Sequence, residues 1–259
     1  MRKFGVEVEG FTSLRSDTLA AALRNDTGIN VRSTGWQRAS TENDVWTITT
    51  DGSIKHPETK EKGKELVSPP LQGTDESYEQ LRKLLRALRS KKVLGDSILK
   101  VDKQCSVHVH IDRSDLSEDD LKKVYTLYSI IEPKLNLMFP DSRRNIKGRG
   151  GKSYCAPIAS VPFKEAFEER SRADLKYYSL QFPAAIPTIE FRIHGASTNP
   201  KKIWYWIRIV NEIITYAVNL PVIEVWDKKM TEEFKLVEIL TSKDLYEYYL
   251  GRVKSLKDK

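Results

Sequence analysis

Three short segments of the chain alternate apolar and ionisable side chains without a break. They are residues 6–9, 107–111 and 188–194, with the sequences VEVE, VHVHI and TIEFRIH. Successive side chains of a β-strand point to opposite faces, so each segment predicts a strand with one apolar and one ionisable face. A chain with three such strands is expected to form a sheet that packs its apolar face against the core and leaves the other face open for chemistry.

The ionisable faces of these segments have an unusual composition. An ordinary half-exposed strand carries Thr, Ser, Lys or Gln on its solvent side. For any one of these strands, the alternative to a functional site is a solvated polar face with an incidental Glu or His. If the three strands are neighbours in one sheet, however, their ionisable side chains converge. Clustered carboxylates repel one another unless they are protonated or share cations, so the pattern favours a divalent metal site. The side chains concerned are Glu7, Glu9, His108, His110, Glu190, Arg192 and His194.

The overall charge suits an anionic partner. The 259 residues include 43 Lys and Arg against 36 Asp and Glu, a formal net charge of +7. This surplus is spread along the chain without an arginine-rich block, so it is compatible with a nucleotide, an acidic peptide or nucleic acid and does not choose among them. The charged fraction of 31% and the hydrophobic fraction of 39% are typical of a globular protein with a sizeable core.

The sequence predicts an intracellular, cytoplasmic protein without membrane association. Glu7 and Glu9 stand where a signal peptide would need its apolar core, and charged residues and a proline interrupt the longest apolar stretch, residues 204–225. Cys105 and Cys155 are too few for a disulfide framework and lack the spacing of a zinc site, so both are expected to be free thiols.

Residues 140–154 form the most basic segment of the chain. The sequence GKS at 151–153 suggests a phosphate-binding loop, but that motif needs glycine at the position of Ile146 and a preceding apolar strand, so we reject it. Two interpretations remain, a flexible basic lid over an anionic ligand and a solvated loop. The lid would use the residues Arg143, Arg144, Lys147, Arg149 and Lys152, with glycines at 148, 150 and 151.

Five motifs in a fixed order resemble the putative amidoligase family. They are E-x-E at 7–9, a tryptophan followed by D-G-S at 51–53, E-L-V-S-P-P at 65–70, H-V-H-I at 108–111 and T-I-E-F-R at 188–192. This family is a branch of the carboxylate-amine ligases with the catalytic fold of glutamine synthetase and glutamate-cysteine ligase. The resemblance covers roughly residues 4–198. Apart from the resemblance, D-G-S has the composition of a turn.

The resemblance implies an α+β fold. Its curved, mainly antiparallel sheet would form the active site on the concave face, with ATP and Mg²⁺ or Mn²⁺, and helices would pack on the convex face. We expect a single catalytic domain over residues 1–259, with the motifs within 4–198 and C-terminal helices at 199–259.

The family also implies roles for individual residues. Glu7, His108 and Glu190 resemble the ligands of one metal ion, and Glu9 and Glu65 those of another.

Arg192 resembles the arginine that contacts the transferring phosphoryl group, and with Glu7, Glu9 and Glu190 it makes up the expected catalytic set. His110 takes the place of the histidine that meets nucleotide or substrate. The remaining residues expected to bind nucleotide or substrate are Asp51, Ser53, His194 and the basic-loop residues Arg143, Arg144, Lys152 and Tyr154.

The implied reaction explains why these residue types occur together. A carboxylate is a poor acyl donor, so ATP phosphorylates it to an acyl phosphate, which an amine attacks to give an amide, ADP and phosphate. Hard oxygen ligands suit Mg²⁺, and two histidines make Mn²⁺ a reasonable substitute. No glutaminase segment accompanies the motifs, so the expected partners are a small-molecule or peptide carboxylate and a free amine or ammonia.

Two alternatives remain from the sequence. One is a phosphotransferase that stops at the phosphorylated substrate, because guanidino kinases have a related catalytic sheet. The other is a nucleic-acid-binding protein without catalysis, suggested by the net charge of +7 and the basic segment.

Overall fold

The computed structural model describes residues 1–35, 44–55, 62–89, 98–144, 155–221 and 234–258. These residues form two compact units. Unit 1 comprises Met1–His110 and Gly195–Trp204, and unit 2 comprises Ile111–His194 and Tyr205–Lys259. The single catalytic domain expected over residues 1–259 stays a prediction.

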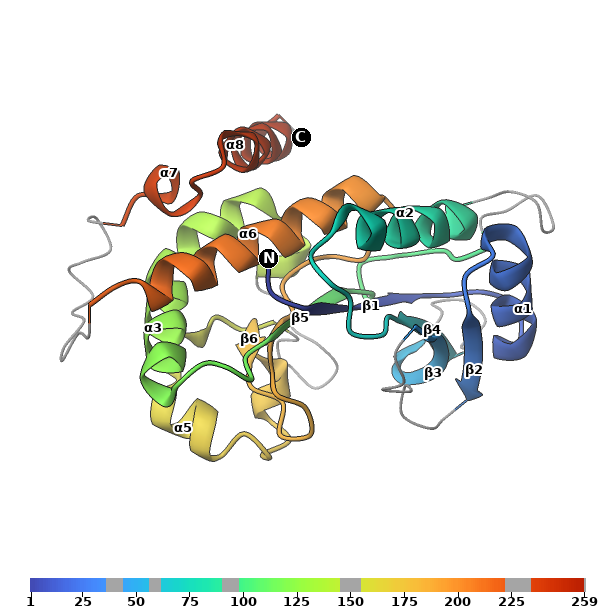
Figure 1. Ribbon diagram of the computed structural model, residues 1–259, viewed down its shortest axis with the longest axis horizontal. Coiled ribbons are helices and arrows are strands. Elements are labelled where there is room, and N and C mark those ends of the chain that lie inside the picture. The colour runs from blue at the N-terminus through green and yellow to red at the C-terminus, as the bar shows by residue number, and fades with distance from the viewer. Residues whose placement is uncertain (36–43, 56–61, 90–97, 145–154, 222–233, 259) are drawn as a thin grey trace. The chain divides into compact units, whose positions relative to one another are not determined.

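Unit 1 contains most of the strands (Figure 1). Strand β1 pairs antiparallel with β4, β4 pairs antiparallel with β3, and β3 pairs parallel with β2. The elements of this unit are β1 (Phe4–Gly10), α1 (Ser16–Thr27), β2 (Val31–Gly35), β3 (Trp46–Lys55), β4 (Lys62–Val67), α2 (Asp75–Arg89) and the first part of β5 (Val107–Asp112).

The apolar face of unit 1 follows the alternation of the sequence. Phe4, Val6 and Val8 of β1 are buried, whereas Gly5 and Glu7 between them are half-buried. Helix α2 covers the apolar face with four fully buried leucines at positions 81, 84, 85 and 88. Such burial of aliphatic side chains supplies about 2 kcal/mol each and fixes which face of the sheet remains open.

Unit 2 is mainly helical. Strands β6 and β7 pair antiparallel, with Gln181 opposite Glu190. The elements are the end of β5, α3 (Glu118–Leu135), η1 (Asn136–Met138), α4 (Asp141–Arg144), η3 (Ile158–Ser160), α5 (Phe163–Glu168), η4 (Leu175–Tyr177), β6 (Leu180–Gln181), β7 (Thr188–Phe191), α6 (Pro200–Val218, begun in unit 1), α7 (Leu236–Ile239) and α8 (Lys243–Lys257).

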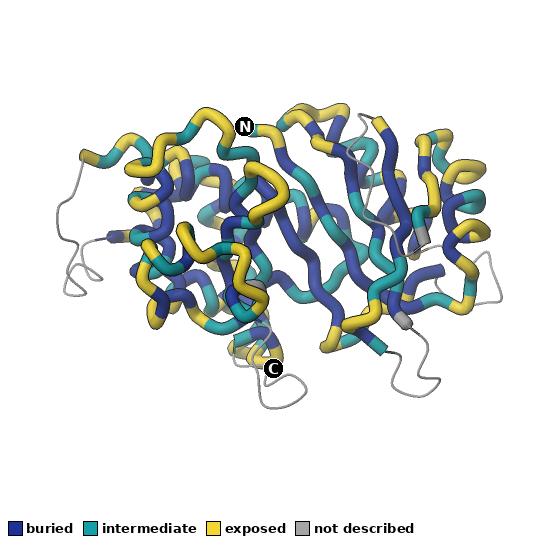
Figure 2. Tube along the Cα trace, turned by 90° about the horizontal axis from the view of Figure 1, so that it is seen from below, coloured by how far each residue is buried: buried dark blue, intermediate teal, exposed yellow. Residues whose placement is uncertain are grey.

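The strand order among the described residues is β2-β3-β4-β1-β5-β7-β6, and the boundary between the units runs through β5. Buried residues gather along the strands, whereas exposed residues lie in connections and on outer helix faces (Figure 2). The predicted α+β class with a mainly antiparallel sheet is confirmed. The glutamine synthetase type, with its concave and convex faces, stays a prediction.

Two local predictions were wrong. The strand expected over residues 188–194 ends at Phe191, because the carbonyls of Arg192 and Ile193 accept hydrogen bonds from the Arg143 side chain instead of a strand partner. The residues Asp51-Gly52-Ser53, expected to form a turn, lie inside β3. The pairing of β3 with β4 shifts register between Asp51 and Lys55.

Candidate metal and active site

The ionisable face of unit 1 brings together side chains from three adjacent strands. Glu7 and Glu9 come from β1, Glu65 from β4, and His108 and His110 from β5. The pairing of β1 with β4 sets Glu9 directly opposite Glu65 and Glu7 opposite Val67. Side chains on directly opposite residues lie about 5 Å apart at Cβ, so this register crowds the carboxylates. The predicted convergence of the β1 and β5 side chains is confirmed within this unit.

A chain of polar contacts orients His108. Its Nδ1 lies 2.9 Å from Glu7 Oε2, and its Nε2 lies 2.9 Å from Ser106 Oγ. The Ser106 hydroxyl and backbone N–H each donate to Glu9 Oε2 at 2.7 Å. His108 thus joins the two carboxylates, contacting Glu7 directly and Glu9 through the Ser106 hydroxyl.

Glu7 is held in its ionised form. Burial raises the pKa of Glu7, but the charges and hydrogen bonds of His110 and His108 outweigh this effect and hold the pKa well below its usual value. His110 Nε2 lies 3.3 Å from Glu7 Oε1. Glu7 is therefore an anion with a histidine on each of its oxygens.

The pKa of Glu65 is shifted upward, opposite to the shift of Glu7. Burial and then the negative charges of Glu7, Glu9 and Asp51 raise its pKa well above the usual value, and a hydrogen bond from Thr49 Oγ1, at 3.2 Å, offsets only part of this. Carboxylates that repel one another in this way are stabilised by a shared cation.

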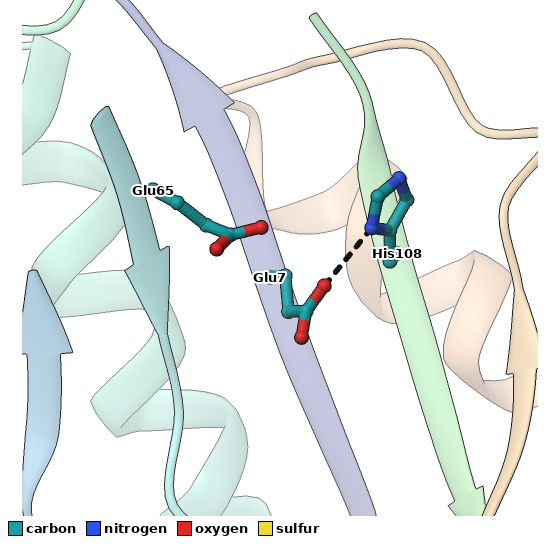
Figure 3. A group of neighbouring side chains, drawn as sticks. All are labelled: Glu7, Glu65 and His108. Atoms are coloured by element: carbon teal, nitrogen blue, oxygen red, sulfur yellow. Dashed lines mark hydrogen bonds and ion pairs between the residues drawn. The ribbon is translucent and has the colours of Figure 1, made fainter. Parts of the chain in front are cut away.

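Three of these residues have the arrangement of a metal-binding site. Glu7, Glu65 and His108 each offer a ligand atom, and these atoms all lie within 4.8 Å of one another. Figure 3 shows the two carboxylates and the imidazole projecting toward one another from their strands. Two carboxylates and one imidazole fit Mg²⁺ or Mn²⁺. We call these three residues the carboxylate–histidine cluster.

Asp51 and Ser53, expected near nucleotide or substrate, lie on β3 at the margin of this cluster. The backbone N–H and the hydroxyl of Ser53 donate to the Asp51 carboxylate at 2.7 and 2.8 Å in an exposed position. Asp51 influences the cluster through its charge, because it is one of the groups that raise the pKa of Glu65.

Comparison with known families gives one match. The family model described as "Putative amidoligase enzyme" matches residues 1–180, more than half of the chain. The chain belongs to this amidoligase family. The match includes the carboxylate–histidine cluster, whereas the segment T-I-E-F-R at 188–192 lies beyond it. A search of curated proteins finds no match. No helix among the described residues has both the length and the apolar character of a membrane span.

In unit 2, Glu190 and Arg192 contact each other. Glu190 is buried and accepts hydrogen bonds from the Arg192 guanidinium and the Gln181 amide. The His194 ring is also buried and packs against Phe139, at 5.6 Å between centroids, and Trp206, at 6.4 Å. Those contacts favour a packing role for His194 over the expected contact with nucleotide or substrate.

The site residues expected in the basic segment fall into two groups. Lys147, Arg149, Lys152 and Tyr154 lie outside the described residues. Arg143 is buried, and its guanidinium donates to the carbonyls of Arg192 and Ile193 at 2.8 and 3.1 Å. Arg144 donates to two carbonyls of the preceding segment at 2.9 and 3.1 Å. For both arginines these bonds favour a structural role over the expected grip on an anion.

Sequence reasoning missed three residues that orient the acidic side chains. Ser106 lies two residues before His108, so the strand period alone would have placed it on the same face. Thr49 and Gln181 reach Glu65 and Glu190 through cross-strand pairing. Their register is not a local property of the sequence, so the sequence pattern gave no means of finding them.

Proposed function

We propose that this protein is an ATP-dependent carboxylate-amine ligase that forms an amide through an acyl phosphate, with Mg²⁺ or Mn²⁺. The observation that supports this best is the carboxylate–histidine cluster of Glu7, Glu65 and His108 in a chain of the amidoligase family. Such a ligase must hold ATP phosphates beside a carboxylate, and a divalent cation supplies the charge that makes this possible.

The residues of unit 1 have two roles, holding the cation and orienting its ligands. Glu7, Glu65 and His108 would hold the cation. Ser106 fixes the ring of His108 by contacting Nε2, and Thr49 fixes the Glu65 carboxylate. Partners of this kind usually contribute about 10- to 100-fold to metal affinity.

Two residues of unit 2 complete the proposal. The family resemblance assigns Glu190 to the metal and Arg192 to the transferring phosphoryl group. The Arg192–Glu190 ion pair supports the assignment of Arg192, since it orients a guanidinium whose planar donors suit phosphate oxygens.

Product analysis tests the reaction. The protein is incubated with ATP, Mg²⁺, a panel of small carboxylates and peptides, and ammonia or simple amines. Mass spectrometry then searches for condensed products together with ADP and phosphate. A phosphorylated carboxylate or guanidine that accumulates without any amide would instead identify a phosphotransferase.

Variants test the site. Glu7→Ala should lower metal-dependent ATP turnover by about 1,000-fold or more without unfolding the protein, because it removes a cation ligand. Glu247→Gln, on the exposed side of α8, is the matched control. Wild-type turnover in Glu7→Ala would reject the site. Salt-sensitive binding of DNA or RNA that survives in Glu7→Ala, in a protein without turnover, would favour the nucleic-acid-binding alternative.

A further inference from the structure

Three glycines lie in β1 and β4, where glycine normally weakens a strand. Two of them have a packing reason. A methyl group on Gly10 would come within 2.5 Å of Leu99 Cγ, and one on Gly63 within 2.1 Å of Ile54 Cδ1. Neither position has room for a side chain.

Gly5 has no such reason. A methyl group there would meet His110 Cβ at 3.6 Å and Ser68 Oγ at 3.8 Å, which are ordinary van der Waals distances among the described residues. Its backbone does not require glycine either, because the described glycine with a positive φ is Gly28. Packing and conformation would both accept a methyl group at position 5.

Gly5 lies on the same face of the sheet as the candidate site. It lies two residues before Glu7 on β1, so both face the same side of the sheet, about 7 Å apart along the strand. Val67, opposite Glu7, adds an aliphatic, half-buried surface to that side. The Ser68 hydroxyl nearby already accepts the Val6 N–H at 2.8 Å. Gly5, Val67 and the Cβ side of His110 thus form an uncharged surface beside the cluster, which we call the Gly5 floor.

We propose that the Gly5 floor receives a flat, uncharged part of a ligand whose anionic end is held at the carboxylate–histidine cluster. The inference rests on the proposed function. Glycine in a strand often marks a place where a ligand approaches the backbone closely, and a side chain at position 5 would occupy that volume. The base of a nucleotide and the organic body of a carboxylate substrate share the required chemistry.

Two substitutions at position 5 test the proposal. Gly5→Ala adds a methyl group that fits, and Gly5→Phe fills the floor. Calorimetry measures the binding of ATP and of inorganic tripolyphosphate, each with Mn²⁺, since tripolyphosphate has the charged end without a base. We expect Gly5→Phe to weaken ATP about tenfold or more and to leave tripolyphosphate unchanged, with Gly5→Ala within about threefold of wild type. Gly251→Phe, at an exposed position where an added Cβ meets no described atom within 4 Å, is the control for added bulk.

The other outcomes are equally distinct. Unchanged ATP binding with a raised KM for the carboxylate substrate would place the substrate on the floor, and it supports the proposal. Unchanged binding and kinetics would overturn it, as would equal weakening of ATP and tripolyphosphate, because the substitution would then act on the cluster.

Stability provides a further check. Phe and Val favour strands more than Gly, so Gly5→Phe and Gly5→Val should melt no lower than wild type. If both variants unfolded, packing would explain Gly5 and the proposal would fail. Failure of the proposed function has another signature, the absence of Mn²⁺-dependent ATP binding in the wild-type protein, and it would overturn this inference as well.

Discussion

Glu65 and Glu132 are acidic side chains of two different units, and their surroundings differ in kind. Glu65 lies beside other carboxylates, whose charges raise its pKa. Glu132, in α3 of unit 2, is 1% exposed and accepts hydrogen bonds from the Ile158 N–H, at 3.0 Å, and from the Ser179 hydroxyl. Burial raises the pKa of Glu132 to about 7, and these two neutral donors lower it only in part.

The difference separates a structural carboxyl from a functional one. Glu132 can take up a proton and still accept hydrogen bonds from its neighbours, so it joins α3 to the segments at Ile158 and Ser179 without needing any ion. The carboxylates of unit 1 repel one another and are satisfied only in part by histidines. Crowding of that kind costs stability in the free protein and is useful when a cation binds.

The largest effect is expected for Glu65→Gln. Removing one of three ligands should weaken Mn²⁺ binding by about 1,000-fold, while the metal-free protein gains about 1 kcal/mol because the repulsion from Glu7, Glu9 and Asp51 disappears. Calorimetry measures the first quantity, and urea unfolding in the presence of a chelator measures the second. A variant that binds Mn²⁺ like wild type, or that loses stability without metal, would contradict the functional interpretation of the crowding.

Glu132→Gln should change the pH dependence of stability. With a pKa of about 7 against an ordinary 4.5, folded Glu132 keeps its proton where the unfolded chain has lost it. This contribution is complete below a pH of about 4.5 and is lost as the pH rises to about 7, a change of about 3 kcal/mol. The substituted glutamine cannot ionise, so the variant should gain stability relative to wild type between pH 5 and pH 8.

Urea unfolding of both proteins at several pH values measures this difference. Groups elsewhere titrate alike in the two proteins, so they cancel in the comparison. A constant difference across that pH range would show that Glu132 does not ionise there, and the contrast with Glu65 would lose its basis.

Ser106→Ala sharpens the comparison within the cluster. Ser106 contacts His108 Nε2 and Glu9 but is not itself an expected ligand. Its loss should weaken Mn²⁺ binding about tenfold, since the His108 ring loses one of its two orienting contacts. Exposed Ser160 provides the control substitution Ser160→Ala. Unchanged affinity in Ser106→Ala would mean that Glu7 alone orients the ring.

Much of unit 1 could be predicted from the sequence because a strand's period of two is a local property. It placed Glu7 and Glu9, and likewise His108 and His110, on one face each. The pairing that sets Glu65 beside Glu9 depends on residues far apart in the chain, and Glu65 was expected only through the family resemblance.

Unit 2 was harder to predict for the same physical reason. Local composition assigned Arg143 to a basic loop, but its hydrogen bonds reach carbonyls about fifty residues away and end the strand at Phe191. Glu132 interrupts no pattern in α3, and only the packed structure shows its burial and its partners.

Asp244 is a third kind of carboxylate, paired with a cation at the surface. Its substitution should have the smallest effect on the free energy of unfolding. Arg208 of α6 donates to both of its oxygens, at 2.5 and 3.0 Å, which joins α8 to α6 within unit 2 and lowers the pKa of Asp244. Because the pair is partly exposed, Asp244→Asn should lower the free energy of unfolding by only about 0.5 kcal/mol at neutral pH.

The stabilisation by this ion pair is present above the ordinary pKa of 3.8 and is lost as the pH falls below it. Wild type and variant should therefore converge in stability in acid and in high salt. Urea unfolding at two salt concentrations measures this. A loss of about 3 kcal/mol, or one insensitive to salt, would show that this surface ion pair holds α8 more firmly than screening by solvent allows.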